Sequence, residues 1–174
     1  MATRWANPIR PALPATESPY NPTRPHPNIK LQYAHALPNA PGLHLVSLLV
    51  TFPPNASTPP HRHPAFVAVN VIKGWVFNGM NDEPIKVFGP VESFHEGLGC
   101  RHRVSDNASE TEEAVIIATM VVESKIFEDG GVEGLVLVDE EWKGIGGVVE
   151  GKGGEKVEWL EILGDDGVHN VSEK

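Results

Sequence analysis

Cysteine, basic residues and long apolar runs are all scarce in this chain of 174 residues. Its single cysteine, Cys100, excludes an internal disulfide bond. Fourteen lysine and arginine residues against 23 aspartate and glutamate residues give a formal net charge of -9, so the chain lacks the positive field that nucleic-acid binding needs. No apolar run is long enough to span a bilayer, and none near the start has the length of a signal peptide. We therefore expect a cytoplasmic protein that binds neither nucleic acid nor membrane.

Proline is abundant at the start of the chain, in residues 1–28. Because proline removes a backbone donor and interrupts helices, this segment is expected to be an extended arm. Two roles stay open for the arm: a loose tail, or a strap that lies along a partner subunit. The whole chain has 40% hydrophobic residues and is long enough for one domain with a core.

Short apolar segments follow the arm and are separated by glycine, proline and asparagine. They predict strands at residues 29–37, 43–52, 65–72, 75–77, 85–88, 93–96, 102–105 and 114–122. The dipeptide Asn78-Gly79 predicts a hairpin turn. Short strands at near-regular spacing are typical of an all-β sandwich or barrel, here over residues 29–123.

The pattern changes in residues 124–174, which are expected to form a loop-rich extension packed on the barrel. One more strand is expected at 135–138 and a helical turn at 139–143. The glycines at 144–154 predict a loop, and residues 156–163 predict a last strand or short helix.

His61 and His63 are two residues apart at the start of the apolar run 65–72. On an extended strand alternate side chains share a face, so both imidazoles can face one point. Imidazole is the commonest side-chain ligand of metal ions in proteins. A third histidine, His102, follows the glycine turn 97–99 at the head of a later expected strand. These histidines are the candidate ligands of one metal ion.

The two histidine segments, in this order and at about this separation, resemble the two signature motifs of the cupin superfamily. His61, His63 and Gly74 match the first motif, and residues 99–102 match the glycine-x-x-histidine part of the second. The resemblance covers residues 43–123 and is strongest to small single-domain cupins of the fungal secondary-metabolism type. It implies an all-β double-stranded β-helix, which is a jelly-roll barrel, and a homodimer.

Two departures from the cupin motifs stand out. The glutamate ligand of the first motif should fall near Val67 or Ala68, and neither side chain can bind a metal. The second motif lacks its proline, because its turn reads Gly97-Leu98-Gly99. The first departure leaves the fourth metal ligand open, while the second leaves His102 in place.

Glu96 lies six residues before His102 and is the candidate catalytic acid or base. Two alternatives stay open for it: the fourth metal ligand, or a solvated turn residue. The expected substrate pocket is apolar, which suits an aromatic or polyketide-sized metabolite better than a sugar. The inward-facing members of residues 115–121 are expected to line it, together with five other side chains: Val67, Val69, Phe77, Phe94 and Leu98.

The resemblance and these residues together imply an enzyme that uses one divalent transition metal, which is Fe, Zn, Mn or Ni. It would act on a small apolar, aromatic or polyketide-like metabolite, and an iron-type dioxygenase is the leading interpretation. One alternative is a redox-neutral lyase, isomerase or decarboxylase on the same kind of substrate. The other is a cupin that binds a ligand without turnover.

Overall fold

The structure is a computed structural model, and it describes residues 9–143. Residues 1–8 and 144–174 lie outside the described part, and so do the glycine-rich loop and the last element that the sequence predicts there. Within residues 9–143 no helix is long and apolar enough to cross a membrane.

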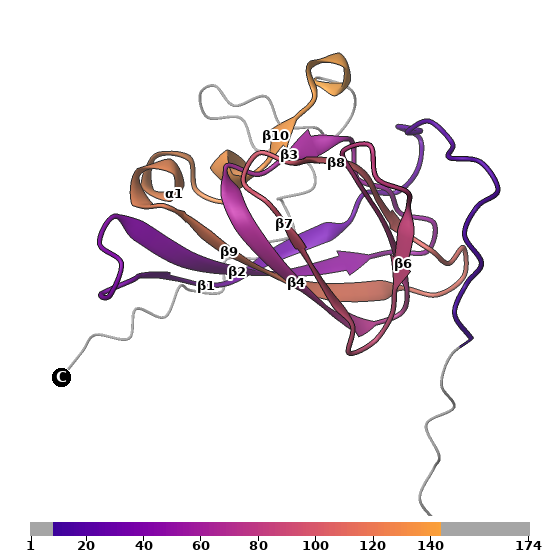
Figure 1. Cartoon of the computed structure of the whole chain (residues 1–174), viewed down its shortest axis with the longest axis horizontal. Coiled ribbons are helices and arrows are strands. Elements are labelled where there is room, and N and C mark those ends of the chain that lie inside the picture. Colours follow the sequence, from indigo (N-terminus) through magenta and orange to yellow (C-terminus); the bar gives the residue numbers. More distant parts are fainter. Residues whose placement is uncertain (1–8, 144–174) are drawn as a thin grey trace, which may run out of the picture.

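The described strands form two five-stranded antiparallel sheets that curve around a common interior (Figure 1). The first sheet has the order β1 (Asn28–Ala36), β2 (Leu43–Phe52), β9 (Ala114–Glu123), β4 (Ala65–Lys73) and β7 (Ser93–Glu96). The second has the order β10 (Leu137–Val138), β3 (His61–Arg62), β8 (Arg101–Asn107), β5 (Val76–Met80) and β6 (Lys86–Phe88).

The chain passes repeatedly between the sheets, with β2, β4, β7 and β9 in the first and β3, β5, β6 and β8 in the second. This alternation is the double-stranded β-helix, so the all-β jelly-roll prediction is confirmed. Strand periodicity explains the interior: Ala65, Val67, Val69 and Val71 of β4 are buried, while the residues between them are more exposed.

Asn78 and Gly79 do not form the hairpin turn that the sequence predicts, because both lie within β5. Gly79 pairs with Val104 of β8, and a β-carbon on Gly79 would lie 3.0 Å from the Val104 β-carbon. The glycine therefore permits a close approach of two strands. The chain turns instead after β5, where Asn81 has a φ of 46°.

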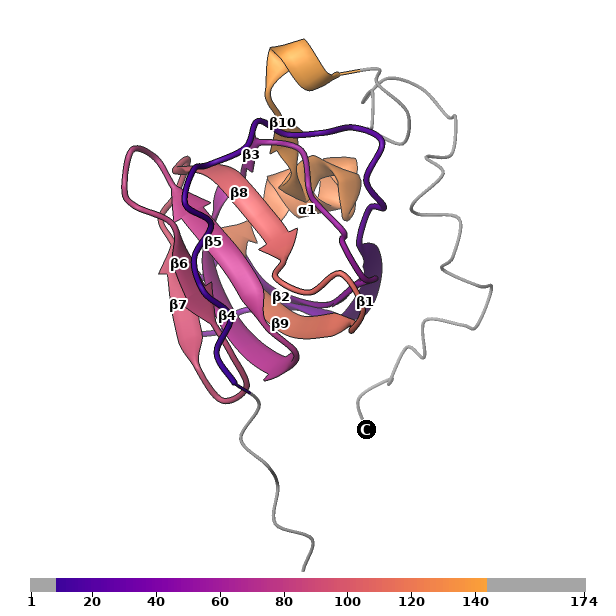
Figure 2. The same cartoon turned by 90° about the vertical axis from the view of Figure 1, so that its right-hand side faces the viewer.

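The described part of the arm, residues 9–27, packs along the chain's own barrel and runs over β5 and β6 (Figure 2). Three ion pairs fasten it: Arg10 with Glu92, Glu17 with Arg103, and Arg24 with Asp106. The arm is therefore not a loose tail in its described part. The expected contact with a partner subunit stays a prediction.

After β9 the chain forms helix α1 (Ser124–Gly130), which the sequence analysis did not predict. The single-turn 3-10 helix η1 (Glu133–Leu135), strand β10 and the 3-10 helix η2 (Glu140–Trp142) follow. The expected strand at 135–138 and helical turn at 139–143 correspond to β10 and η2. Leu135 is fully buried in the core, so this segment closes one end of the interior.

Candidate metal centre

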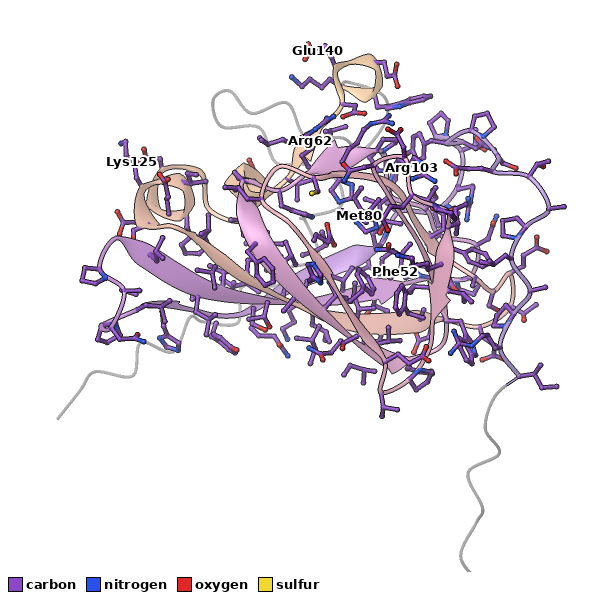
Figure 3. All side chains as sticks on the ribbon, viewed as in Figure 1. Phe52, Arg62, Met80, Arg103, Lys125 and Glu140 are labelled. Carbon is purple, nitrogen blue, oxygen red and sulfur yellow. The ribbon has the colours of Figure 1, made fainter. Side chains whose placement is uncertain are left out.

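A cavity of about 70 Å³ lies between the two sheets. Its wall is mostly apolar, and Phe52 from β2 is one of its buried side chains (Figure 3). Four buried titratable residues converge on it: His61, His63, Glu96 and His102. The structure thus brings together residues from β3, from the connection after it, from β7 and from β8, although they span more than 40 positions of the sequence.

His61 and His63 are held by backbone carbonyls. The Nδ1 atom of His61 lies 2.7 Å from the Pro59 carbonyl oxygen, and the Nδ1 atom of His63 lies 2.6 Å from the Leu135 carbonyl oxygen. A carbonyl oxygen can only accept a hydrogen bond, so Nδ1 carries the proton in both rings. The Nε2 lone pairs are left for a metal ion, which is the arrangement common among metal-binding histidines.

His102 lies directly opposite His61 in the pairing of β3 with β8, and the ring centroids are 5.2 Å apart. Its Nε2 atom is 3.2 Å from the side-chain nitrogen of Asn78, which is also buried. Its Nδ1 atom is 3.2 Å from Glu96 Oε2. Asn78 and Glu96 therefore contact the ring from its two nitrogen sides.

Glu96 reaches the cavity from β7, where it pairs with Val67 of β4. Its Oε2 atom is 3.6 Å from His63 Nε2. Ligand atoms from His61, His63 and Glu96 all lie within 4.8 Å of one another, so the described residues contain a buried two-histidine, one-carboxylate group that could hold a metal ion. His102 is not part of that group of three but contacts its carboxylate.

Two atoms of the site indicate that a cation fits there. Among the described residues, neither Glu96 Oε2 nor His102 Nδ1 has a hydrogen-bond partner of good geometry, although both atoms are buried and 3.2 Å apart. Buried polar atoms in this state are costly unless another group satisfies them. Imidazole nitrogens with one carboxylate oxygen are a donor set that suits divalent transition metals.

The protonation states agree with this donor set. Burial, with the nearby imidazoles of His63 and His102, lowers the pKa of His61 to about 3. Burial also lowers the pKa of His63. For Glu96 burial alone would raise the pKa, but the imidazoles of His102, His63 and His61 together lower it to about 2. At neutral pH the site therefore holds neutral His61 and His63 beside a carboxylate, the forms in which these groups bind metals.

Only some of the five expected pocket residues lie at or near the cavity. Val67 lines the cavity, while Val69 is buried in the core beyond it. Phe94 is half-buried, and its ring centroid lies 6.3 Å from that of His102. Contrary to expectation, Phe77 faces a groove under the arm, because its neighbours Val76 and Asn78 face inward. Leu98, also expected in the pocket, is 74% exposed in the loop before β8.

Several lining residues were missed by sequence reasoning. Most are ordinary apolar residues, which carry no signal that separates a cavity wall from a packed core: Ile29, Leu48, Val50, Phe52, Val136 and Val138. Ile116, Ala118 and Met120 also line the cavity, and they are the inward-facing members of the run 115–121 that the sequence predicts there. Asn78, which contacts His102 but does not line the cavity, was missed because the sequence predicts a turn at its position. His26 and Pro27 of the arm also line the cavity.

No family model and no curated protein matches the chain. Solved structures are similar to it at low sequence identity. One is a Klebsiella pneumoniae protein with a double-stranded β-helix domain, with a TM-score of 0.48 and 13% identity over 60% of this chain and 84% of that one. Another is a Bordetella pertussis cupin domain, with a TM-score of 0.44 and 21% identity over 56% and 95%.

A DMSP lyase from Ruegeria pomeroyi is similar with a TM-score of 0.46 and 18% identity over 55% of this chain. The chain spans about half of that lyase, with 46% of its length covered. The similar structures are thus cupin-type double-stranded β-helix proteins.

Proposed function

We propose that this protein is a metal-dependent enzyme of the cupin type that acts on a small, mainly apolar metabolite. The observation that carries the proposal is the buried group of His61, His63 and Glu96 at the wall of an apolar cavity. The resemblance of the histidine segments to small fungal cupins supports a metabolite of the aromatic or polyketide kind.

His61, His63 and Glu96 would hold the metal ion, with His102 beside the carboxylate. When bound, a divalent ion would polarise an oxygen atom of the substrate, and iron would in addition allow oxidative chemistry. The carbonyls of Pro59 and Leu135 fix the two imidazoles in the orientation that exposes Nε2.

The cavity wall has its own part in the reaction. Leu48, Val50, Ile116 and Met120 face the cavity and offer the substrate apolar contacts. Such a wall excludes water from the reacting atoms and so strengthens the electrostatic effect of the site's charges. It also disfavours sugars and other highly polar substrates.

The donor set favours a dioxygenase over redox-neutral chemistry. Two histidines with one carboxylate and open positions are the ligand pattern of non-haem Fe(II) oxygenases. In a lyase or isomerase Glu96 would act as a general base and not as a general acid, because its lowered pKa of about 2 keeps this carboxyl ionised at neutral pH. The homodimer that the resemblance implies stays a prediction.

Elemental analysis of the purified protein tests the metal. We expect about one transition metal ion per chain in the wild type and in His95→Ala, since His95 is an exposed imidazole next to Glu96. His61→Ala should lose the ion while keeping the far-ultraviolet circular dichroism of the fold. Absence of stoichiometric metal from the wild type, both as isolated and after loading, contradicts the proposal.

Oxygen uptake tests the reaction class. Iron-loaded protein would be mixed with catechol or pentane-2,4-dione as probes, and oxygen consumption would be followed with an electrode. We expect uptake that depends on His61 and not on His95. Product formation from the same probes by zinc-loaded protein without oxygen would instead favour the redox-neutral alternative.

A further inference from the structure

The cavity wall holds a second polar region besides the four residues of the metal centre. His26, Thr58 and Ser105 also line the cavity, whose other lining side chains are mostly apolar. Because polar side chains in a mainly apolar wall can hydrogen-bond a polar group of a ligand, this half-buried region has consequences for which substrates fit.

Backbone contacts place the three residues on adjacent segments. The carbonyl of Pro25 accepts a hydrogen bond from the Ser57 amide at 2.9 Å, and the carbonyl of Ser105 accepts one from the Thr58 amide at 3.0 Å. The arm, the segment before β3 and strand β8 therefore lie side by side here. His26 enters the cavity wall as part of this layer.

The end of the arm is firmly held. Arg24 donates to Asp106 at 2.6 Å and to the backbone carbonyls of Asn55 and Ala56. Asp106 also accepts a hydrogen bond from the Ser57 hydroxyl at 2.7 Å. His26 lies two residues after Arg24, so the hydrogen bonds of Arg24 hold its imidazole in position. A group that selects a substrate has to be held in this way.

The second polar region lies at a distance from the metal centre. Ser105 is three residues along β8 from His102, which is about 10 Å along a strand. Residues three apart on a regular strand face opposite sides, but the pairing of β5 with β8 contains a bulge between Gly79 and Met80. The bulge explains why His102 and Ser105 both face the cavity.

We propose that His26 contacts the substrate and selects metabolites that carry a hydroxyl or carbonyl group several carbons away from the oxygen atoms that bind the metal. This inference rests on the proposed function, because it assigns one end of the substrate to the metal centre. The substrate class is then a chelating head, a short apolar body and a second hydrogen-bonding group.

Hydroxamates test this selection, because they chelate transition metals and can be obtained with or without a terminal hydroxyl. Cobalt-loaded protein would be titrated with straight-chain hydroxamates of three to six carbons and with their terminal-hydroxy derivatives, and binding would be followed by visible absorption. For at least one chain length we expect the hydroxy derivative to bind the wild type about 5- to 10-fold more tightly, about the value of one hydrogen bond.

The variant His26→Phe should abolish this preference and leave the affinity for the unsubstituted hydroxamates within about twofold. His26→Gln, which keeps a hydrogen-bonding side chain, should retain part of the preference. His26→Leu, which cannot hydrogen-bond, should abolish it and serves as the test if His26→Phe does not fold. His35→Phe, at an exposed histidine of β1, is the matched control and should behave as the wild type.

The outcomes separate the two proposals. A wild type without preference at any chain length overturns the role of His26, and so does a preference that survives in His26→Phe or, where that variant does not fold, in His26→Leu. Failure of every hydroxamate to bind cobalt-loaded protein, or failure of cobalt to bind, overturns the proposed metal centre instead.

Discussion

Glu96 lies directly opposite Val67 in the antiparallel pairing of β7 with β4. Val67 is one of the two positions at which the first cupin motif would have its glutamate. Residues that are opposite in an antiparallel pair have β-carbons about 4.5–5.5 Å apart on the same face of the sheet. A carboxylate at position 96 therefore reaches the same cavity as one at position 67, and the neighbouring strand supplies the missing group.

This relationship predicts that the carboxylate can be moved between strands. Glu96→Ala should weaken binding of Co²⁺ or Zn²⁺ by more than about 100-fold, since even the loss of a group that only orients a ligand costs 10- to 100-fold. Adding Val67→Glu to that variant should recover at least about tenfold. Affinities would be measured by competition with a chromophoric chelator at pH 7.5.

Ala68→Glu in the Glu96→Ala background is the matched control for this exchange. Ala68 pairs with the exposed His95, so a carboxylate there points away from the cavity and should recover nothing. Unchanged metal affinity in Glu96→Ala would show that the carboxylate is not a ligand.

A second prediction concerns Asn107, the buried last residue of β8. Its amide nitrogen donates to the carbonyls of Phe52, Pro53 and Glu112 at 2.8–3.2 Å, and its side-chain oxygen accepts from the Ser109 amide. Asn107→Ala removes these hydrogen bonds to buried and partly buried backbone groups and should lower the free energy of unfolding by about 2–4 kcal/mol. Urea denaturation measures it.

The exposed Asn39 provides the comparison for Asn107. Asn39→Ala should change the free energy of unfolding by less than about 0.5 kcal/mol, as is usual for surface positions. Equal losses in the two variants would mean that the hydrogen bonds of Asn107 contribute little.

Local patterns in the sequence predict the strands well where burial alternates and turn residues bound the run. Strands β2 and β7 have the predicted bounds, and β4 is one residue longer. The prediction failed at Asn78-Gly79 because a tertiary contact, the close approach of β8, decides the backbone there. Helix α1 was missed because it is short and has no side-chain cap at its start to mark it.

In the candidate site too, local sequence features identify some residues, while tertiary contacts decide the position of others. The spacing of His61 and His63 and the glycine turn before His102 are local features, so these residues were identified from the sequence. The pairing of Glu96 with Val67 depends on strand register, which the sequence does not reveal. Phe77 was misplaced because the inward face of β5 is set by its partners, not by hydrophobicity alone.

A third prediction concerns Asp139, which joins the C-terminal segment to the metal centre. Its carboxylate accepts from Arg62 of β3 and Arg101 of β8, and its amide donates to the Pro60 carbonyl. The same segment contains Leu135, whose carbonyl holds His63. Asp139→Ala should lower the free energy of unfolding by about 1–2 kcal/mol, because the two arginines are partly exposed.

Metal affinity is the more specific measurement for Asp139. We expect Asp139→Ala to weaken Co²⁺ binding by several-fold to about tenfold, because the carbonyl that orients His63 becomes less well fixed. Asp129→Ala removes an exposed pair with Lys125 and should change neither quantity measurably. An Asp139 variant that loses stability but keeps its metal affinity would show that the C-terminal segment does not contribute to metal binding.

A fourth prediction concerns the pH dependence of the metal-free protein. The pKa of His61 is lowered from 6.5 to about 3 in the folded chain, so between these values the unfolded chain binds a proton that the folded chain does not. Stability therefore rises with pH across this window and is lost as pH falls below about 6.5. Each such histidine contributes up to about 1.4 kcal/mol per pH unit. Glu96, whose pKa is lowered to about 2, adds a loss in the same direction, but only below about pH 4.5.

Urea denaturation in the presence of a chelator, at pH 7.5, 6.0 and 5.0, measures this effect. The wild type should lose stability steadily over this range, and His61→Leu should lose it less steeply, because one of the groups that takes up a proton on unfolding is gone. His95→Leu removes an exposed imidazole and should keep the wild-type slope. A His61→Leu slope equal to that of the wild type would mean that His61 takes up its proton equally in both states, and the buried neutral imidazole on which the metal centre depends would be excluded.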